Sequence, residues 1–111
     1  MNTLEEGCLL RIFIGETDKH NGKPLYEWLV QQAKAANLRG ATILRGVEGY
    51  GSHRDIHTAK ILQLATNLPL VVEIIDTAEK INAFIAVIDP IMMGGLITLE
   101  KIKLKSYHGK T

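Results

Sequence analysis

The chain has 111 residues, of which 46% are hydrophobic and 23% are charged, and its 13 basic and 12 acidic side chains give a net charge of +1. This length and apolar content suit a single folded domain over residues 1–111. The near-zero net charge excludes a global attraction for nucleic acid. The single cysteine, Cys8, excludes an intramolecular disulfide framework. No apolar run reaches the roughly 18–20 residues that span a bilayer, so we expect a cytoplasmic protein without direct membrane insertion.

The first half of the chain predicts a strand, a helix and a second strand. Glu5-Glu6 is interpreted as a solvated tail, and the apolar run 8–14 is typical of a strand covered on both faces. Pro24 suits the first helical position, and Gly40 suits the positive φ that ends a helix. The expected apolar face of this helix consists of Leu25, Trp28, Leu29, Ala33 and Ala36. A second strand is expected at residues 41–47.

The second half repeats this order after a long excursion. Residues 52–68 mix helical and strand spacing, and we interpret them as a long loop. A third strand is predicted at residues 69–75, with Asp76-Thr77 as the cap of a second helix that Pro90 ends. The expected buried face of this helix consists of Ile81, Phe84, Ile85 and Ile88.

The predicted fourth strand, residues 96–105, changes its apolar phase. Ile97 and Leu99 point to one side of the strand, whereas Ile102 and Leu104 point to the other. A strand with one buried face cannot show this pattern. Either a bulge shifts its register, or its second half packs against something beyond the core.

This order of elements predicts an α+β, ferredoxin-like βαβ-βαβ fold: a four-stranded antiparallel sheet with two helices on one face. The first and third strands are apolar on both sides, yet two helices cover only one face of the sheet. The simplest cover for the second face is another copy of the chain, because most soluble oligomers are homo-oligomers.

Several segments together carry a family resemblance from residue 10 to about residue 105. They are Ile14-Gly15-Glu16, Gly40-Ala41-Thr42, Arg45-Gly46-Val47-Glu48-Gly49-Tyr50-Gly51, Leu68-Pro69-Leu70-Val71-Val72-Glu73-Ile74-Ile75-Asp76, Glu79-Lys80-Ile81 and Gly94-Gly95-Leu96-Ile97-Thr98. With these segments the chain resembles the PII-like signalling superfamily of ferredoxin-like trimers. Within that superfamily it is most similar to the small PII-like proteins of the domain-of-unknown-function (190) family.

The resemblance implies a non-enzymatic regulator that forms a homotrimer and binds a small anionic ligand, such as an adenine nucleotide, between subunits. It implies that residues 52–68 signal to a partner protein, for which a membrane transporter or an enzyme is expected. The implied ligand-binding residues are Gly49, Gly51, Ser52, Gly94, Gly95, Lys103 and Lys105.

Departures from PII proper leave the ligand open. PII carries Arg-Gln after its loop-base glycines and a lysine after its second glycine turn, where this chain has Ser52-His53 and Leu96. ATP, another adenine nucleotide, another anion and no ligand all remain open outcomes. From the residues alone, simple tight turns are the favoured interpretation of the glycines. The alternating lysines at 101, 103 and 105 are interpreted first as a solvated strand edge and second as groups that neutralise phosphate.

The histidines provide an alternative function. His53 and His57, with Asp55 between them, form a short cluster of metal-ligating residue types. By analogy of fold with CutA-type trimers, a divalent-metal site is the alternative hypothesis. The His-x₃-His spacing brings both rings together only on a helix, so loop histidines that titrate near neutral pH are the plainer interpretation. A third alternative is a structural oligomer without a ligand. No acid, base and nucleophile set indicates an enzyme.

Overall fold

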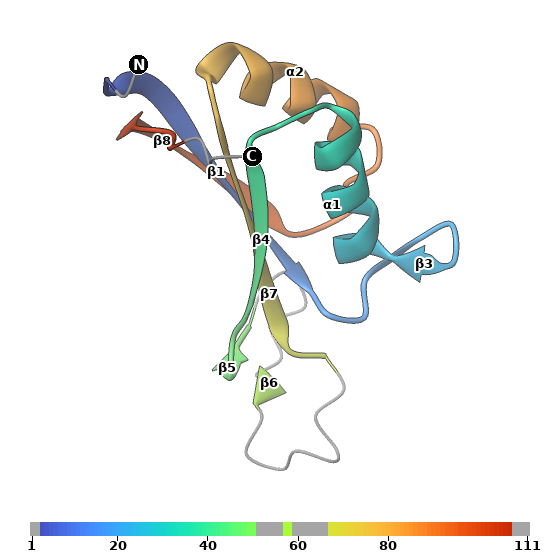
Figure 1. The fold of residues 1–111 in the computed structure, drawn as a ribbon. Coiled ribbons are helices and arrows are strands. Elements are labelled where there is room, and N and C mark those ends of the chain that lie inside the picture. The colour runs from blue at the N-terminus through green and yellow to red at the C-terminus, as the bar shows by residue number, and fades with distance from the viewer. Residues whose placement is uncertain (1–2, 51–56, 59–66, 108–111) are drawn as a thin grey trace.

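The computed structural model describes residues 3–50, 57–58 and 67–107. Four long strands form one antiparallel sheet in the order β4-β7-β1-β8. These strands are β1 (Glu5–Gly15), β4 (Gly40–Arg45), β7 (Pro69–Asp76) and β8 (Leu96–Leu104). Helices α1 (Leu25–Ala35) and α2 (Ala78–Ile88) both lie on one face of this sheet (Figure 1). The structure therefore confirms the predicted ferredoxin-like arrangement.

Two short hairpins accompany the main sheet. Strand β2 (Lys19–His20) pairs with β3 (Lys23–Pro24) through Asn21-Gly22, where both residues have positive φ, as an Asn-Gly hairpin turn favours. Strand β5 (Glu48–Gly49) pairs with β6 (His57–Thr58). Most of the predicted loop at residues 52–68 lies outside the described residues.

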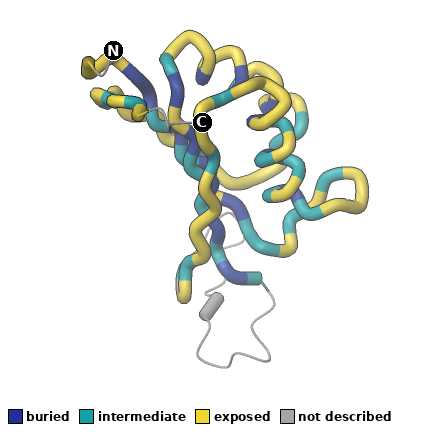
Figure 2. Tube along the Cα trace, in the orientation of Figure 1, coloured by how far each residue is buried: buried dark blue, intermediate teal, exposed yellow. Residues whose placement is uncertain are grey.

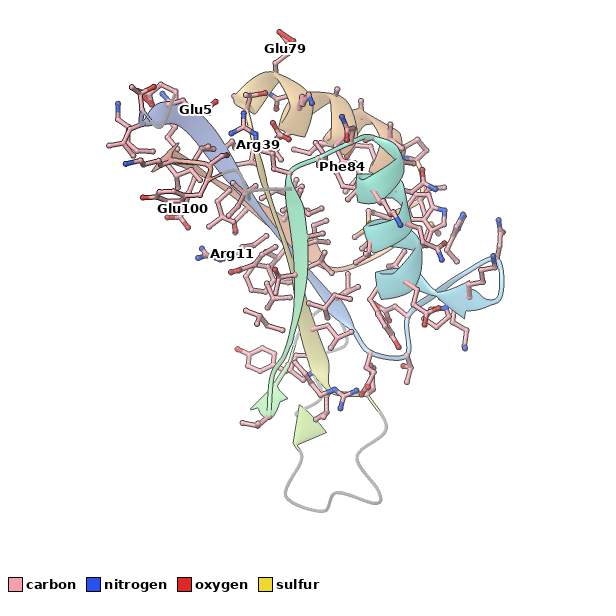
Figure 3. The ribbon with its side chains drawn as sticks, in the orientation of Figure 1. Glu5, Arg11, Arg39, Glu79, Phe84 and Glu100 are labelled. Atoms are coloured by element: carbon pink, nitrogen blue, oxygen red, sulfur yellow. The ribbon has the colours of Figure 1, made fainter. Side chains whose placement is uncertain are left out.

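The core lies between the two helices and the sheet (Figure 2). Alternate residues of the central strands point into it, and each helix contributes one apolar stripe. The buried core side chains include Leu10, Ile12, Ile14, Leu29, Leu70, Val72, Ile74, Ile81, Phe84 and Ile88. Phe84 is the largest of them, is only 2% exposed, and lies between α2 and the sheet (Figure 3).

The helix ends differ in detail from the sequence-based predictions. Pro24 is the N-cap of α1 and not its first residue, and Ala36 follows the helix as an exposed C-cap. The positive φ after α1 belongs to Asn37, at 60°, because asparagine tolerates this conformation better than most residues other than glycine. Thr77 caps α2 as predicted, and its hydroxyl accepts the N–H of Lys80 at 3.3 Å. Asp89 keeps helical angles although it precedes a proline.

The other face of the sheet is apolar and has no cover among the described residues. Partners in an antiparallel ladder share a face, so the register places eight half-buried or exposed apolar side chains on this side. They are Leu9, Phe13, Leu44, Val71, Ile75, Leu96, Ile102 and Leu104, and we call them the open face. The prediction that the first and third strands, β1 and β7, are apolar on both sides is confirmed apart from Arg11 and Glu73.

A charged group lies in the middle of the open face. Arg11 Nε donates to Glu73 Oε2 at 2.9 Å, and Arg11 also pairs with Glu100 on the neighbouring strand. Figure 3 shows Arg11 and Glu100 on the side of the sheet away from the helices. The hydrogen bond to Glu73, followed by that to Glu100, raises the pKa of Arg11, so the guanidinium stays charged.

The pairing of β8 with β1 decides between the two explanations for the change of apolar phase along β8. Its pairing with β1 runs without interruption from Phe13–Leu96 to Glu5–Leu104, so no bulge shifts the register. Ile97 and Leu99 therefore face the helices, whereas Ile102 and Leu104 belong to the open face. The second half of β8 directs its apolar side chains away from the core, as the second of the two alternatives required.

Candidate functional site

Backbone turns gather at the end of the sheet where β1 and β4 end and β7 and β8 begin. The Gly46 N–H donates to the Pro69 carbonyl at 2.7 Å, and Gly49 lies beside the same proline. Gly95 has φ of +82°, and a Cβ added there would lie 2.3 Å from the Phe13 carbonyl oxygen. Only glycine fits this position without strain. The glycine at position 95 therefore has a structural reason that is independent of any ligand.

The two glycine turns lie at opposite edges of this sheet end. Gly46 and Gly49 follow edge strand β4, whereas Gly94 and Gly95 precede edge strand β8. Strands β7 and β1 lie between them, so at about 4.8 Å per strand the two edges are about 14 Å apart. One chain alone therefore does not bring the two predicted glycine turns together.

The predicted lysines lie at the other end of the sheet. Lys103 is eight residues along β8 from Gly95, which at about 3.3 Å per residue is a separation of about 26 Å. Lys103 Nζ donates to Glu6 Oε1 at 2.6 Å, and Lys105 Nζ lies 5.3 Å from the centre of the Tyr107 ring. The structure thus places the lysines far from the glycines of the same chain.

The remaining predicted site residues are not placed. Gly51, Ser52 and His53 lie outside the described residues, and for His57 the structure describes only the backbone of β6. Within the described part of the chain, no three His, Cys, Asp or Glu side chains form a group that could hold a metal ion. The metal alternative stays a prediction.

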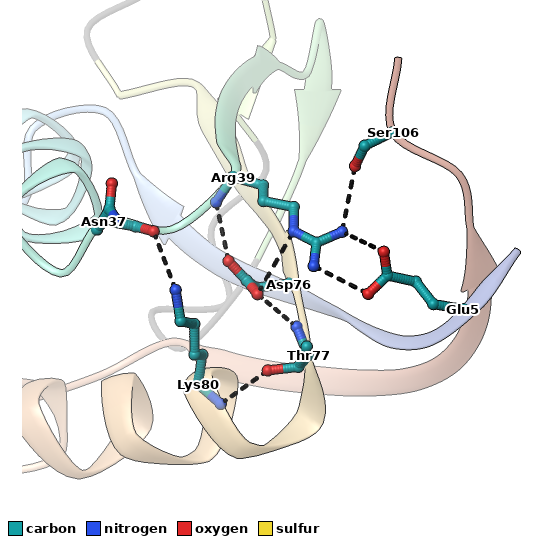
Figure 4. A network of polar contacts seen from close by, with 7 residues as sticks. All are labelled: Glu5, Asn37, Arg39, Asp76, Thr77, Lys80 and Ser106. Carbon is teal, nitrogen blue, oxygen red and sulfur yellow. Dashed lines mark hydrogen bonds and ion pairs between the residues drawn. The ribbon is translucent and has the colours of Figure 1, made fainter. Parts of the chain in front are cut away.

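A polar network connects five segments at the lysine end of the sheet (Figure 4). The buried carboxylate of Asp76, 1% exposed, accepts the backbone N–H groups of Arg39 at 3.0 Å and Thr77 at 2.7 Å. The Arg39 guanidinium holds Glu5 through two hydrogen bonds of 2.9 and 3.0 Å, and it also donates to Ser106 Oγ at 3.1 Å. Glu5 and Glu6 are exposed to solvent as predicted, but the interpretation of them as a tail is wrong, because both residues begin β1 and pair with cations.

The Glu5–Arg39 pair makes stability depend on pH. The hydrogen bond from Arg39 lowers the pKa of Glu5 below its ordinary value of 4.5. Because the folded-state pKa is lowered, the stabilisation is present above the unfolded pKa and is lost as the pH falls through the folded pKa. We expect Glu5→Gln to lower the free energy of unfolding at pH 7 and to have a smaller effect at pH 3, as measured by urea unfolding. An equal effect at both pH values would contradict this linkage.

The structure also shows an ion pair that sequence reasoning missed. Arg45, the last residue of β4, pairs with Glu16, which directly follows β1. The two residues are 29 positions apart. They reach the same sheet end only because β1 and β4 lie on either side of β7, both antiparallel to it, so that the two strands end side by side. The one sign of this residue in the sequence is its position, because Arg45 directly precedes the glycine-rich segment 46–51.

The geometry defines the class of protein: a ferredoxin-like α+β fold of the PII-like type. One solved structure of similar fold is CPII, a nitrogen regulatory PII-like protein from Thiomonas intermedia, bound to ADP, AMP and bicarbonate. It covers 96% of this chain and 94% of its own, with a TM-score of 0.72 and 16% sequence identity. This likeness establishes the fold.

The chain belongs to the DUF190 family, described as uncharacterized ACR, COG1993, whose model matches residues 7–104. A UPF0166 protein of Aquifex aeolicus is 46% identical over 86% of this chain and 90% of its own length. A UPF0166 protein of Methanocaldococcus jannaschii is 32% identical over 93% of this chain and 94% of its own. The predicted family is thereby confirmed. Neither α1 nor α2, the helices of the described residues, has the length and apolarity to cross a membrane.

Proposed function

We propose that this chain is a cytoplasmic, non-enzymatic regulator that forms a homotrimer and binds a small anionic ligand in clefts between its copies. An adenine nucleotide is the first ligand to test. In this proposal, residues 52–68 carry the signal to a partner protein, either a membrane transporter or an enzyme. The partner reads whether the cleft is occupied, because the ligand favours one arrangement of that segment.

The open face is the observation that carries this proposal. Two helices cover one side of the sheet, while the other side presents apolar residues along all four strands, with Ile75 38% exposed and Leu96 58% exposed. Covering such a face removes apolar area from water at about 25 cal/mol per Å². The uninterrupted register of β8 supports the same conclusion, because Ile102 and Leu104 turn to the open face. Copies of the chain provide the simplest matching apolar cover.

The separation of the predicted site residues supports a site between chains. Within one chain, Gly95 and Lys103 lie about 26 Å apart along β8. A ligand of nucleotide size can contact both groups only if the glycines come from one copy and the lysines from another. A trimer with closed symmetry repeats such an arrangement three times.

The chemistry of the two groups suits an anion. Backbone N–H groups at glycine turns approach a phosphate closely because no Cβ intervenes, and they present partial positive charge to it. Lysine ammonium groups supply full positive charge. The ADP and AMP bound by CPII, a protein of similar fold, support an adenine nucleotide as the ligand class.

Calorimetric titration of the assembled protein with ADP, AMP and ATP tests the proposal. We expect saturable binding of at least one nucleotide, and the double change Lys103→Gln with Lys105→Gln is expected to weaken it at least tenfold, because each charge-assisted contact contributes about 1.5 kcal/mol or more. Lys101→Gln, on the same face of β8, is the matched control and should leave the affinity nearly unchanged. A folded trimer that binds none of the nucleotides would contradict the ligand part of the proposal.

A further inference from the structure

We propose that Arg45 is an additional ligand-binding residue, whose guanidinium contacts the anionic group of the ligand at the glycine-turn end of the sheet. Glu16 is its counter-ion in the ligand-free protein, and the ligand takes the place of this carboxylate. The inference rests on the proposed function, because it assigns a residue to the same anion site.

The position of Arg45 is the first argument. It directly precedes Gly46, whose N–H is fixed to Pro69, so its backbone is held at the same sheet end as the glycine turns. The predicted lysines of the same chain lie at the far end of β8. Among the described residues, Arg45 is therefore the arginine that this chain itself places beside the turn that follows β4.

The unused donors of Arg45 are the second argument. Arg39 engages Glu5 through two nitrogens and also contacts Asp76 and Ser106. Arg11 donates hydrogen bonds to two carboxylates, those of Glu73 and Glu100. Arg45, by contrast, donates from one nitrogen to Glu16 and makes no other hydrogen bond to the residues that the structure describes. An arginine has five N–H donors, so the bond to Glu16 uses only a small part of the hydrogen-bonding capacity that a phosphate group replacing this carboxylate can use.

The exposure of the pair is the third argument. The side chain of Arg45 is 60% exposed, whereas that of Glu16 is 23% exposed. Glu16 is also fixed through its backbone, since its N–H donates to the Leu68 carbonyl at 2.9 Å. The carboxylate is therefore the stationary partner, and the longer arginine side chain is the one that reaches solvent. An ion pair of this exposure is weak, and a phosphate oxyanion that accepts two hydrogen bonds is the stronger partner.

This arrangement makes Glu16 an internal competitor of the ligand. A carboxylate that holds the guanidinium must be displaced before an anionic ligand can bind there. Removing the negative charge of Glu16 should tighten ligand binding, while removing the positive charge of Arg45 should weaken it. Opposite effects of the two halves of one ion pair are not expected if the pair only stabilises the fold.

The test is calorimetric titration of the full-length, assembled protein with ADP, and with adenosine as a probe that lacks phosphate. We expect Arg45→Gln to weaken ADP binding about tenfold or more, and Glu16→Gln to tighten it about two- to fivefold. Both variants should leave adenosine binding unchanged. Lys34→Gln and Glu79→Gln, exposed positions on α1 and α2, are the matched charge controls and should leave ADP binding unchanged. Circular dichroism and sedimentation verify that each variant folds and assembles.

The outcomes separate this inference from the proposed function. If the wild-type protein binds ADP and Arg45→Gln binds it equally well, the assignment of Arg45 is overturned alone. If Glu16→Gln weakens ADP binding, the role of Glu16 as a competitor is overturned. If the assembled wild-type protein binds no ADP, this inference and the nucleotide proposal fail together.

Discussion

Ile75→Glu is expected to convert the proposed assembly of copies into single 12.3 kDa chains that keep the fold. Ile75 lies on the open face of β7 and is 38% exposed in one chain, so a glutamate there remains hydrated as long as the chain is alone. In the assembly its charge would be buried against another copy without a partner, at a cost of several kcal/mol per ion. Sedimentation velocity at micromolar concentration measures the result.

The matched control for this change is Val87→Glu. Val87 is also an exposed apolar residue, but it lies on the outer side of α2 and not on the open face. We expect this variant to keep the wild-type sedimentation coefficient. If both variants assemble like the wild type, the open face is not the surface through which the copies meet.

Asp76→Ala is expected to lower the free energy of unfolding by about 3 kcal/mol. The buried carboxylate satisfies the backbone N–H groups of Arg39 and Thr77, and it faces the Arg39 guanidinium at 3.8 Å. Alanine would leave both N–H groups without their acceptor and would remove a partner of the Arg39 guanidinium. Urea unfolding followed by circular dichroism measures the change.

Asp89→Ala is the control for this prediction. Asp89 is also an aspartate next to an end of α2, but it is exposed. A surface substitution of this kind changes stability by about 0.5 kcal/mol or less. If Asp76→Ala were as mild as Asp89→Ala, the network at the start of β1 would contribute little to the fold.

Most of the fold could be predicted from the sequence because its main signals are local. The apolar run at residues 8–14 has the composition of a buried strand. The apolar residues that end at Ile88 recur once per helical turn, which indicates a helix with one buried face. The change of apolar phase in β8 could also be recognised in the sequence. The choice between a bulge and an outside partner, however, depended on the pairing register of β8 with β1. Details that depend on one backbone conformation, such as the positive φ at Asn37, were assigned to the wrong residue.

The candidate site was less predictable because its contacts are distant in sequence. Arg45 meets Glu16 across 29 residues, and Lys103 meets Glu6 across 97. No local pattern encodes such pairs. Glu5-Glu6 resembled a solvated tail because charged residues near a chain end usually are solvated, and only the strand pairing with β8 shows that both belong to the sheet. The glycine turns and lysines were named from family resemblance, which does not reveal that one chain keeps them apart.

Sedimentation equilibrium of the unmodified protein at micromolar concentration tests the central claim most directly. If the apolar side of the sheet is covered by sister copies, the measured mass corresponds to three copies of the 12.3 kDa chain and does not change on dilution through this range. A mass of one stable chain would contradict the account, because neither the cover of the sheet nor a cleft between copies would then exist.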